Sequence, residues 1–125
     1  MLDKANRLRK DADFRKTFKF SRPVNVGRLS LRVAQNQKLL KLENPVSRFG
    51  IVISNKIDKR ATRRNALRRQ LRAIVRNLLP AFPHGYDVII MVRECYNFPF
   101  VQAEIEKDLK DGLKKTGLLN SQISN

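Results

Sequence analysis

The 125-residue chain has little of several residue types on which common functions depend. It has one cysteine, Cys95, one histidine, His84, and only 11 acidic residues against 27 lysines and arginines. A lone cysteine excludes an internal disulfide and is compatible with a reducing compartment. No apolar run is long enough to span a bilayer, and no hydrophobic segment follows the basic start. We therefore predict one cytoplasmic domain, residues 1–125, with no membrane partner.

The sequence also lacks the groups that a hydrolytic enzyme needs, which are a nucleophile with a base, paired carboxylates or a metal cluster. Cys95 has no second cysteine or histidine at ligand spacing, which argues against zinc. His84 stands between a proline and a glycine, where a turn residue is expected. Asp58 and Asp87 could touch a magnesium ion held by a nucleic acid, but helix capping and ion pairing are the simpler roles. We predict no catalytic residue and no cofactor bound by the protein itself.

Positive charge is what the chain has in abundance, with a formal net charge of +16. A free protein with this charge repels itself, and a polyanionic partner is the usual remedy. The charge is concentrated in residues 59–86, which contain no acidic residue, and seven arginines fall within residues 60–76. This composition favours nucleic acid as the partner, with membrane lipid as a weaker alternative.

The arginine-rich segment has the periodicity of an amphipathic helix. Its apolar stripe repeats at i, i+4, i+7 and i+11, and consists of Leu67, Leu71, Ile74 and Leu78. The adjacent face forms a basic ridge about 25 Å long by helix rise, and arginine suits bidentate phosphate contacts. With the turn that precedes it, the basic ridge supplies the candidate RNA-binding residues Lys56, Lys59, Arg60, Arg63, Arg64, Asn65, Arg68, Arg69, Arg72 and Arg76.

Two further helices are predicted. A short one has Asp11 as its expected N-cap and carries Phe14 and Phe18 on one face. The last helix should open near Pro99. Its expected inward residues are Val101, Ile105, Leu109 and Leu113, and its expected outward acids are Glu104, Glu106, Asp108 and Asp111. The end of the chain, residues 116–125, is expected to be frayed.

Three strands are predicted. Alternating apolar residues indicate strands at 29–34 and 48–54, which we expect to form a hairpin with an irregular loop. The continuous apolar run at 86–92 is typical of a central strand covered on both faces. The basic helix lies between the second and third strands, with Asp58 as a possible cap and an end expected before Pro80. A strand, a helix and a strand in this order predict two parallel strands in a mixed sheet.

Residues 54–72, SNKIDKRATRRNALRRQLR, resemble the signature of the bacterial ribonuclease P protein subunit. That signature has a serine and two lysines, a short basic turn, and R-N-R-x-K-R-x-x-R on a helix. The basic lead at residues 7–10, Phe14 and Phe18, and the strands near 49–51 and 86–88 extend the resemblance over about residues 6–119. Ala66 and Asn55 stand where the signature has an arginine and a lysine, so one phosphate or base contact is in question.

The resemblance implies an α/β sandwich with a mixed central sheet and three helices, related to a ribosomal-protein domain. It also implies a left-handed crossover through the basic helix. The family is the protein partner of a catalytic RNA, and together they form the endoribonuclease that removes the 5′ leader from precursor tRNA. The RNA positions the Mg²⁺ ions and performs the hydrolysis, while the basic helix faces the RNA. No obligate protein partner is evident.

The resemblance further implies a cleft between the first helix and the sheet that holds the single-stranded leader. Electropositive grooves with aromatic side chains bind single strands because every base offers a π-face. Phe14 and Phe18 fit this role, although core packing of either ring is the alternative. The family often has an aromatic where Ser30 and Arg32 stand. The candidate cleft residues are Phe14, Arg15, Phe18, Ser30, Arg32 and Ser54.

Two other classes of function remain to be weighed. A structural ribosomal or RNA-assembly protein would share the basic ridge but would bind no substrate. A DNA-binding helix-turn-helix regulator would need a short helix and turn before its basic helix, and the sequence shows neither. The identity of the RNA that copurifies separates the first alternative from a ribonuclease P subunit.

Overall fold

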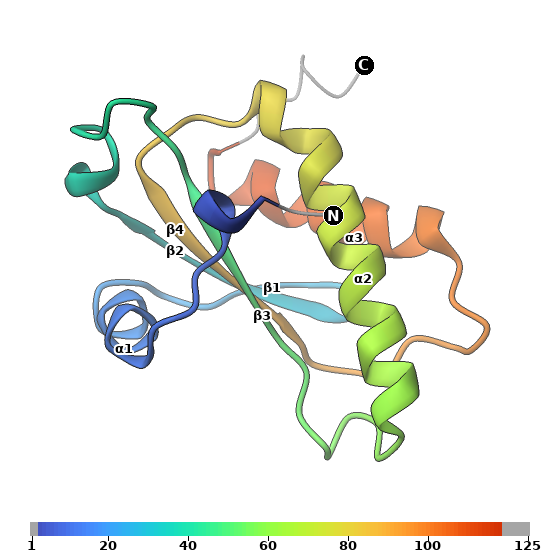
Figure 1. The fold of residues 1–125 in the computed structure, drawn as a ribbon. Coiled ribbons are helices and arrows are strands. Elements are labelled where there is room, and N and C mark those ends of the chain that lie inside the picture. Colours follow the sequence, from blue (N-terminus) through green and yellow to red (C-terminus); the bar gives the residue numbers. More distant parts are fainter. Residues whose placement is uncertain (1–2, 119–125) are drawn as a thin grey trace.

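A four-stranded mixed sheet organises the chain in the computed structural model, which describes residues 3–118 (Figure 1). The strands are β1 (Val24–Val26), β2 (Leu29–Gln35), β3 (Arg48–Val52) and β4 (Tyr86–Val92). The α-helices are α1 (Asp11–Lys19), α2 (Ala61–Leu78) and α3 (Gln102–Lys115). Short 3-10 turns occur at η1 (Lys4–Asn6), η2 (Gln37–Leu39) and η3 (Leu79–Ala81).

The strands lie in the order β1-β2-β4-β3, so β4 is an inner strand, as its continuous apolar run predicts. β3 and β4 are parallel, with Ile51 opposite Ile90, which confirms the predicted crossover unit. The predicted hairpin between strands 29–34 and 48–54 is wrong, because β4 lies between them and pairs antiparallel with β2. The hairpin is formed instead by β1 and β2, with Gly27 in its turn at a φ of 56° that favours glycine.

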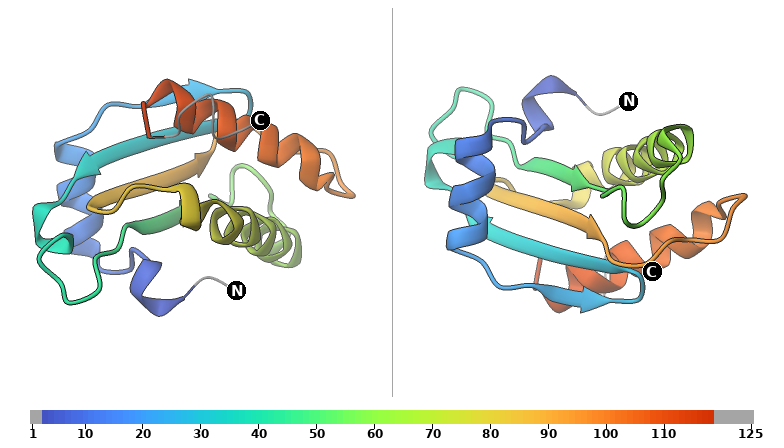
Figure 2. Two further views of the ribbon diagram at one scale, coloured as in Figure 1. Left: turned by 90° about the horizontal axis from the view of Figure 1, so that it is seen from above. Right: turned by 90° about the horizontal axis from the view of Figure 1, so that it is seen from below.

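The two faces of the sheet are covered by different helices. Figure 2 shows α2 and α3 on one face and α1 crossing the other. Followed from β3 through α2 to β4, the chain turns with the left hand, against the usual right-handed rule (Figures 1 and 2). The fold is therefore an α+β sandwich, with the mixed central sheet and three helices that the resemblance implies.

The apolar core lies between the sheet and the pair α2 and α3. The stripe of α2 is buried at Leu67, Leu71 and Ile74, as predicted, and Leu78 at its end is partly buried. Each fully buried side chain of this size contributes about 1.5–3 kcal/mol relative to its exposed state. The buried side chains of the sheet and of α3 that belong to the same core are Leu29, Leu31, Val88, Ile90, Ile105, Leu109 and Leu113.

The helix starts differ from the expectations. The N-cap of α1 is Lys10, and Asp11 is the first helical residue, where a carboxylate still interacts favourably with the helix dipole. Asp58 precedes the N-cap of α2, and its Oδ1 accepts from the Arg60 amide at 2.9 Å. α3 begins at Gln102 rather than near Pro99, so Val101 is its N-cap and is exposed.

Two expectations about α3 and the end of the chain need correction. Asp108 does not face outward, because its Oδ2 accepts from the Tyr96 hydroxyl at 2.7 Å and from the Arg28 amide at 3.3 Å. Residues 116–118 are not frayed. Gly117, at a φ of 82°, and Leu118 close the helix with amide bonds to Lys114 and Leu113, the pattern of a Schellman cap. Residues 119–125 lie outside the described part.

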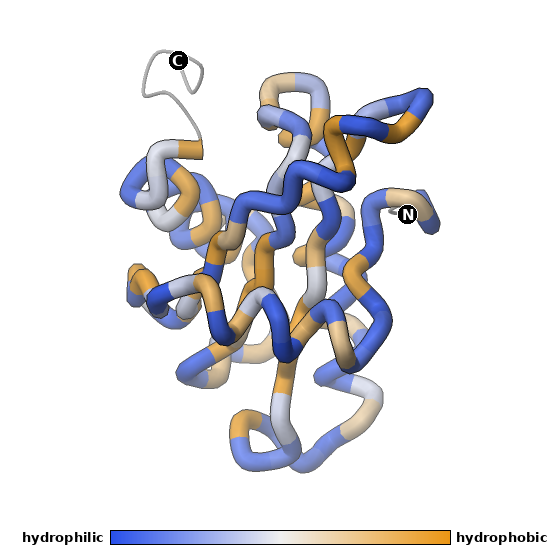
Figure 3. Tube along the Cα trace, turned by 90° about the vertical axis from the view of Figure 1, so that its left-hand side faces the viewer, coloured by the Kyte–Doolittle hydropathy of each residue, from blue (hydrophilic) through white to orange (hydrophobic). Residues whose placement is uncertain are grey.

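The N-terminal segment runs along the outer edge of β3. The Leu8 amide donates to the Phe49 carbonyl at 2.9 Å, Arg7 forms a parallel bridge with Phe49, and the Asn6 side-chain amide donates to the Ser47 carbonyl at 2.9 Å. Leu8 is buried. Figure 3 shows that the N-terminal segment is mostly hydrophilic. A strongly basic piece of chain is thereby fixed beside the sheet. Within residues 3–118, no helix is both long and apolar enough to cross a membrane.

Candidate nucleic-acid interface

The basic ridge lies on the side of α2 that faces away from the apolar core. The helix has 18 residues, or about five turns. Arg60, Asn65, Arg69 and Arg76 are exposed, while four arginines nearer the sheet are half-buried. Those four are Arg63, Arg64, Arg68 and Arg72. All ten candidate RNA-binding residues belong to α2 or to the exposed loop before it, where Lys56 and Lys59 lie.

Neutral groups hold two of the ridge guanidiniums in place. Arg64 Nη1 donates to the Asp58 carbonyl oxygen at 2.8 Å, and Arg68 Nη1 donates to Asn65 Oδ1 at 3.0 Å. Neither acceptor carries a charge, and within residues 3–118 neither guanidinium forms an ion pair, so the side chains are oriented without being neutralised. This arrangement leaves the fixed donors available to phosphate oxygens.

The ridge continues onto the N-terminal segment through Arg7. The pKa of Arg72 is lowered, first by burial and then by the nearby charges of Arg7 and Arg68. Arg72 is thus close enough to be repelled by guanidiniums from two separate segments, Arg7 of the N-terminal segment and Arg68 of α2. Such repulsion is relieved by a polyanion that bridges them.

An aromatic contact at the start of the ridge was not predicted from the sequence. The guanidinium of Arg63 lies 4.2 Å from the centroid of the Phe98 ring, which is 53% exposed. Phe98 in turn meets Phe100 edge to face at 5.3 Å. The two phenylalanines flank Pro99 in the sequence, and that spacing was the available signal for an aromatic pair.

The candidate leader cleft lies where α1 crosses the sheet. Phe14 rests on the backbone of β3, because a Cβ built on Gly50 would lie only 2.4 Å from Phe14 Cζ. The ring is half-buried, and its edge packs against Gly50; a contact of the remaining surface with a leader stays a prediction. Arg15, on the outer side of α1, is exposed.

Phe18 is the accessible ring of the pair, with 37% of its surface exposed. The guanidinium of Arg32 on β2 lies 4.8 Å from its centroid, and Arg32 Nη1 also donates to the Ser21 carbonyl at 3.2 Å. An aromatic ring and a fixed cation therefore lie together at the end of α1. Ser30, two residues before Arg32, is buried, and Ser54 is exposed beyond the end of β3.

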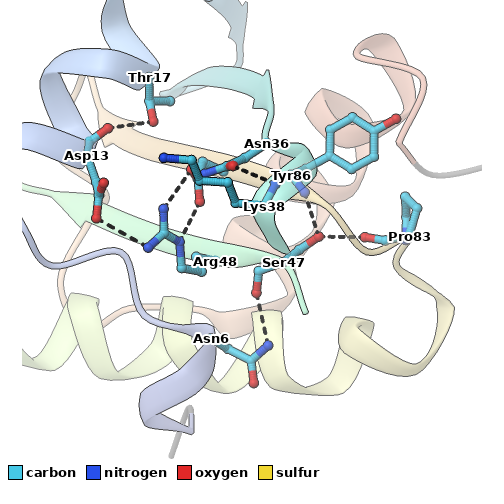
Figure 4. Close-up of polar contacts among 10 residues, drawn as sticks. Asn6, Asp13, Thr17, Asn36, Lys38, Ser47, Arg48, Pro83 and Tyr86 are labelled. Atoms are coloured by element: carbon cyan, nitrogen blue, oxygen red, sulfur yellow. Dashed lines mark hydrogen bonds and ion pairs between the residues drawn. The ribbon is translucent and has the colours of Figure 1, made fainter. Parts of the chain in front are cut away.

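A polar network ties α1 to the sheet on the other flank of the helix (Figure 4). Arg48 binds Asp87 through two nitrogens, at 2.8 and 2.9 Å, and reaches Asp13 of α1 at 3.2 Å. The Asn36 amide also donates to Asp87, at 2.9 Å. The hydrogen bond to Asp87 is the main reason that the pKa of Arg48 is raised. Asp87 therefore takes part in an ion pair, one of the two simpler roles expected for it.

Within residues 3–118, no three histidine, cysteine, aspartate or glutamate side chains lie together in a way that could hold a metal ion. His84 is exposed in the segment before β4, next to Gly85 at a φ of 94°. Cys95 is exposed with a free thiol. The arrangement can bind and orient an anionic polymer.

Comparison with known proteins agrees with this geometry. A family model described as Ribonuclease P matches residues 2–117. A ribonuclease P protein component from Cyanothece sp. is 37% identical over 135 aligned positions, covering 96% of this chain and 98% of the relative. One from Pseudanabaena sp. is 36% identical, with the same shares covered.

Solved structures show the same fold. The RNase P protein from Staphylococcus aureus superposes with a TM-score of 0.78 at 24% identity, over 94% of this chain and 100% of that one. The RNase P protein from Thermotoga maritima superposes with a TM-score of 0.68 at 26% identity, over 87% and 96%.

Proposed function

The chain belongs to the ribonuclease P family, and we propose that it is the RNA-binding protein subunit of a ribonuclease P ribonucleoprotein. In this proposal it assists a catalytic RNA in the endonucleolytic removal of the 5′ leader from precursor tRNA. The holoenzyme acts in the cytoplasm. The relatives carry the name of the protein component of this enzyme, and the basic surface described above suits such a partner.

The basic ridge is the observation that carries the proposal. It presents a row of arginines along about five turns of one rigid helix, two of them, Arg64 and Arg68, held by neutral acceptors, and bound phosphate would reduce the repulsion on Arg72 from Arg7 and Arg68. Phosphates of the catalytic RNA fit this requirement. At the position of Ala66 no side chain reaches a phosphate, and the neighbouring Arg63 and Arg69 supply the local charge.

The second part of the proposal is that the cleft beside α1 holds the single-stranded leader. Phe18 offers an exposed ring face, and Arg32 fixes a cation against it. Stacking of a base on such a ring is independent of base identity. A leader of any sequence can therefore be held, as a general processing enzyme requires.

The division of labour follows from the side chains. The protein supplies cations that neutralise phosphates where two polyanions meet, and it orients the leader. In this proposal the Mg²⁺ ions are bound by the RNA, which also performs the hydrolysis. The fixed arginines reduce the need for free cations to screen the two RNAs, so the protein should help most when magnesium is scarce.

The first test is reconstitution with the cognate catalytic RNA. The RNA-free protein should leave precursor tRNA uncut, and adding it to the RNA should raise cleavage most at low magnesium. Site-specific cleavage by the protein alone would overturn the proposed division of labour. If the protein binds the catalytic RNA but changes neither cleavage nor precursor affinity, the structural RNA-binding alternative is favoured.

The leader cleft is tested with Phe18→Ala and a matched control, Phe20→Ala. Phe20 is more exposed, at 64%, and its ring contacts Lys19 rather than Arg32. Phe18→Ala should cost the holoenzyme about 1–3 kcal/mol in affinity for precursor tRNA and nothing for mature tRNA, whereas Phe20→Ala should change neither. Equal weakening for both RNAs by Phe18→Ala would remove the cleft from the proposal.

A further inference from the structure

A second basic concavity, separate from the ridge and the leader cleft, lies beside the N-terminal end of α1. It has a volume of about 520 Å³, within the roughly 300–1,000 Å³ typical of ligand sites. We call it the basic hollow. It is built from the N-terminal segment, the first half of α1 and the loop between β2 and β3, with Arg48 also in its lining. Its other cationic lining residues are Lys4, Arg7, Arg9, Lys10, Lys16 and Lys38.

The charges of the hollow do not balance. Among the described residues, Asp13 is the one carboxylate in its lining, and it is engaged by Arg48, which also binds Asp87. In the part of the chain that the structure describes, no carboxylate forms an ion pair with Lys4, Lys10 or Lys38. A concave surface lined by one sign of charge focuses the field and concentrates counter-ions. The hollow is therefore prepared for an anion larger than a single carboxylate.

The helix α1 separates the hollow from the leader cleft. Asp13 and Lys16 line the hollow, whereas Phe18 meets Arg32 at the cleft. On the side of the sheet, the hydrogen bonds of Arg48 to Asp13 and of Asn36 to Asp87 fill the space between α1 and the loop after β2 (Figure 4). A ligand in the cleft therefore does not fill the hollow.

The hollow is instead continuous with the basic ridge. Arg7 lines the hollow and also lies close enough to Arg72 of the ridge to lower its pKa. From these observations we propose that the basic hollow binds backbone phosphates of the same catalytic RNA that the ridge contacts. This inference rests on the proposed function, since it assumes that the partner on the ridge is an RNA. It extends the protein's RNA footprint around the edge of β3 to the far side of the sheet.

The side chains in the hollow suit phosphate rather than base recognition. Four of its cations are lysines, whose ammonium groups act as point charges without a preferred planar geometry. Lysine contacts of this kind neutralise phosphates and release counter-ions, but they do not read sequence. The exposed Leu42 at the rim offers an apolar surface for a sugar.

The test removes three charges at once and compares two matched variants. Lys4→Ala/Lys10→Ala/Lys38→Ala removes three exposed lysines of the hollow. Lys107→Ala/Lys114→Ala/Lys115→Ala removes three from α3, beside the acidic Glu106 and Asp111. Affinity of the full chain for the cognate catalytic RNA is measured from low to high KCl, and thermal unfolding checks that both variants are folded. The ridge variant Arg68→Ala/Arg72→Ala is measured alongside.

The slope of log affinity against log salt is negative, and we expect the hollow variant to make it shallower by about 2–3. Each phosphate contact that is lost means that about 0.7–0.9 fewer counter-ions are released on binding. The α3 variant should change the slope by less than about 0.5. The inference is overturned if the ridge variant has the expected shallower salt slope but the hollow and α3 variants change the slope equally, or not at all. If the ridge variant also leaves the slope unchanged, the proposed function itself fails.

The other source of phosphates is the leader of the precursor. Precursor affinity is therefore measured with holoenzyme assembled at saturating protein. An unchanged precursor affinity together with a weaker catalytic-RNA contact supports the inference. A loss of precursor affinity with an unaltered catalytic-RNA salt slope would assign the hollow to the leader and overturn it.

Discussion

The two faces of the sheet differ in what they bury. The face under α2 and α3 is apolar, and Leu31 of β2 and Ile90 of β4 are fully buried there. The face under α1 carries Arg32, Arg48 and Asp87, and it is covered by a helix of nine residues whose own buried residue is Thr17. The first face is closed by apolar packing, whereas the second combines the ion pair between Arg48 and the buried Asp87 with the partly exposed ring of Phe18.

This difference explains how a small chain carries so much positive charge. The arginines of the ridge are placed on the outer side of a helix whose inner side is fixed by apolar packing, so their repulsion does not separate α2 from the sheet. The free energy of burying apolar side chains does not depend on the charges on the opposite side of the helix. The energy of an ion pair, in contrast, would be changed by nearby charges. Binding groups can then be changed with little effect on the core.

The strongest test of this separation compares neighbours on α2. Leu71→Ala removes a fully buried side chain from the apolar face and should cost about 2–5 kcal/mol of unfolding free energy. Arg72→Ala, one residue later on the ridge, should cost less than about 1 kcal/mol but weaken catalytic-RNA binding. Urea unfolding and RNA titration measure both. Similar stability losses for the two variants would show that the ridge is also part of the structural core.

On the polar face, the ion pair of Arg48 and Asp87 should contribute to the stability of the fold, unlike the arginines of the ridge. Arg48→Met leaves the Asp87 carboxylate, whose side chain is 6% exposed, without its cation. We expect a loss of about 3 kcal/mol in unfolding free energy, because an uncompensated buried charge is costly. Adding Asp87→Asn should recover part of that loss, so the double variant should be more stable than the sum of the single effects predicts. Additive losses would mean that the pair does not stabilise the fold.

Local patterns in the sequence predicted the elements that pack by themselves. The α2 stripe and the central strand 86–92 were found because a helical period or a continuous apolar run reflects burial directly. The pairing of β2 with β4 was not found, because strand partners are decided by residues far apart in the chain. β1 has only three residues, too few for a period-two pattern.

The candidate site also has a part that the sequence predicted and a part that it did not. The basic ridge could be predicted because all its residues belong to one helix and the turn before it. The basic hollow could not, since its lining comes from the N-terminal segment, α1 and the loop after β2. The inward turn of Asp108 was missed for the same reason, because its partners Tyr96 and Arg28 lie on other segments.

A smaller effect is expected where α1 touches the sheet. Gly50→Ala would place a Cβ 2.4 Å from Phe14 Cζ, so the ring and its helix must shift. We expect a loss of about 1–3 kcal/mol in unfolding free energy from this overpacking. In a Phe14→Ala background the same glycine substitution should cost much less, which a double-mutant cycle of thermal or urea unfolding measures. An equal cost in both backgrounds would show that Phe14 is not the obstacle.

The smallest expected effect on the free energy of unfolding comes from Tyr96, the buried tyrosine of the apolar core. Tyr96 is 3% exposed and donates to Asp108 at 2.7 Å, and its pKa is raised, first by burial and then by that hydrogen bond. The folded state therefore keeps the phenol protonated, while the unfolded chain loses the proton near pH 10. Because the unfolded state then binds fewer protons, the contribution of Tyr96 is complete below about pH 10 and is lost as the pH rises above it.

Tyr96→Phe separates this contribution from the titration of the many lysines, which both proteins share. The variant should be about 1 kcal/mol less stable than the parent at pH 7, from the lost hydrogen bond. That gap should be constant between pH 6 and 8 and should narrow from about pH 9 to 11, because only the parent carries the titrating phenol. Urea unfolding of both proteins across this range gives the measurement. A gap that stays constant up to pH 11 would show that the phenol ionises equally well in the folded protein, and the apolar face would then be less closed at Tyr96 than its burial indicates.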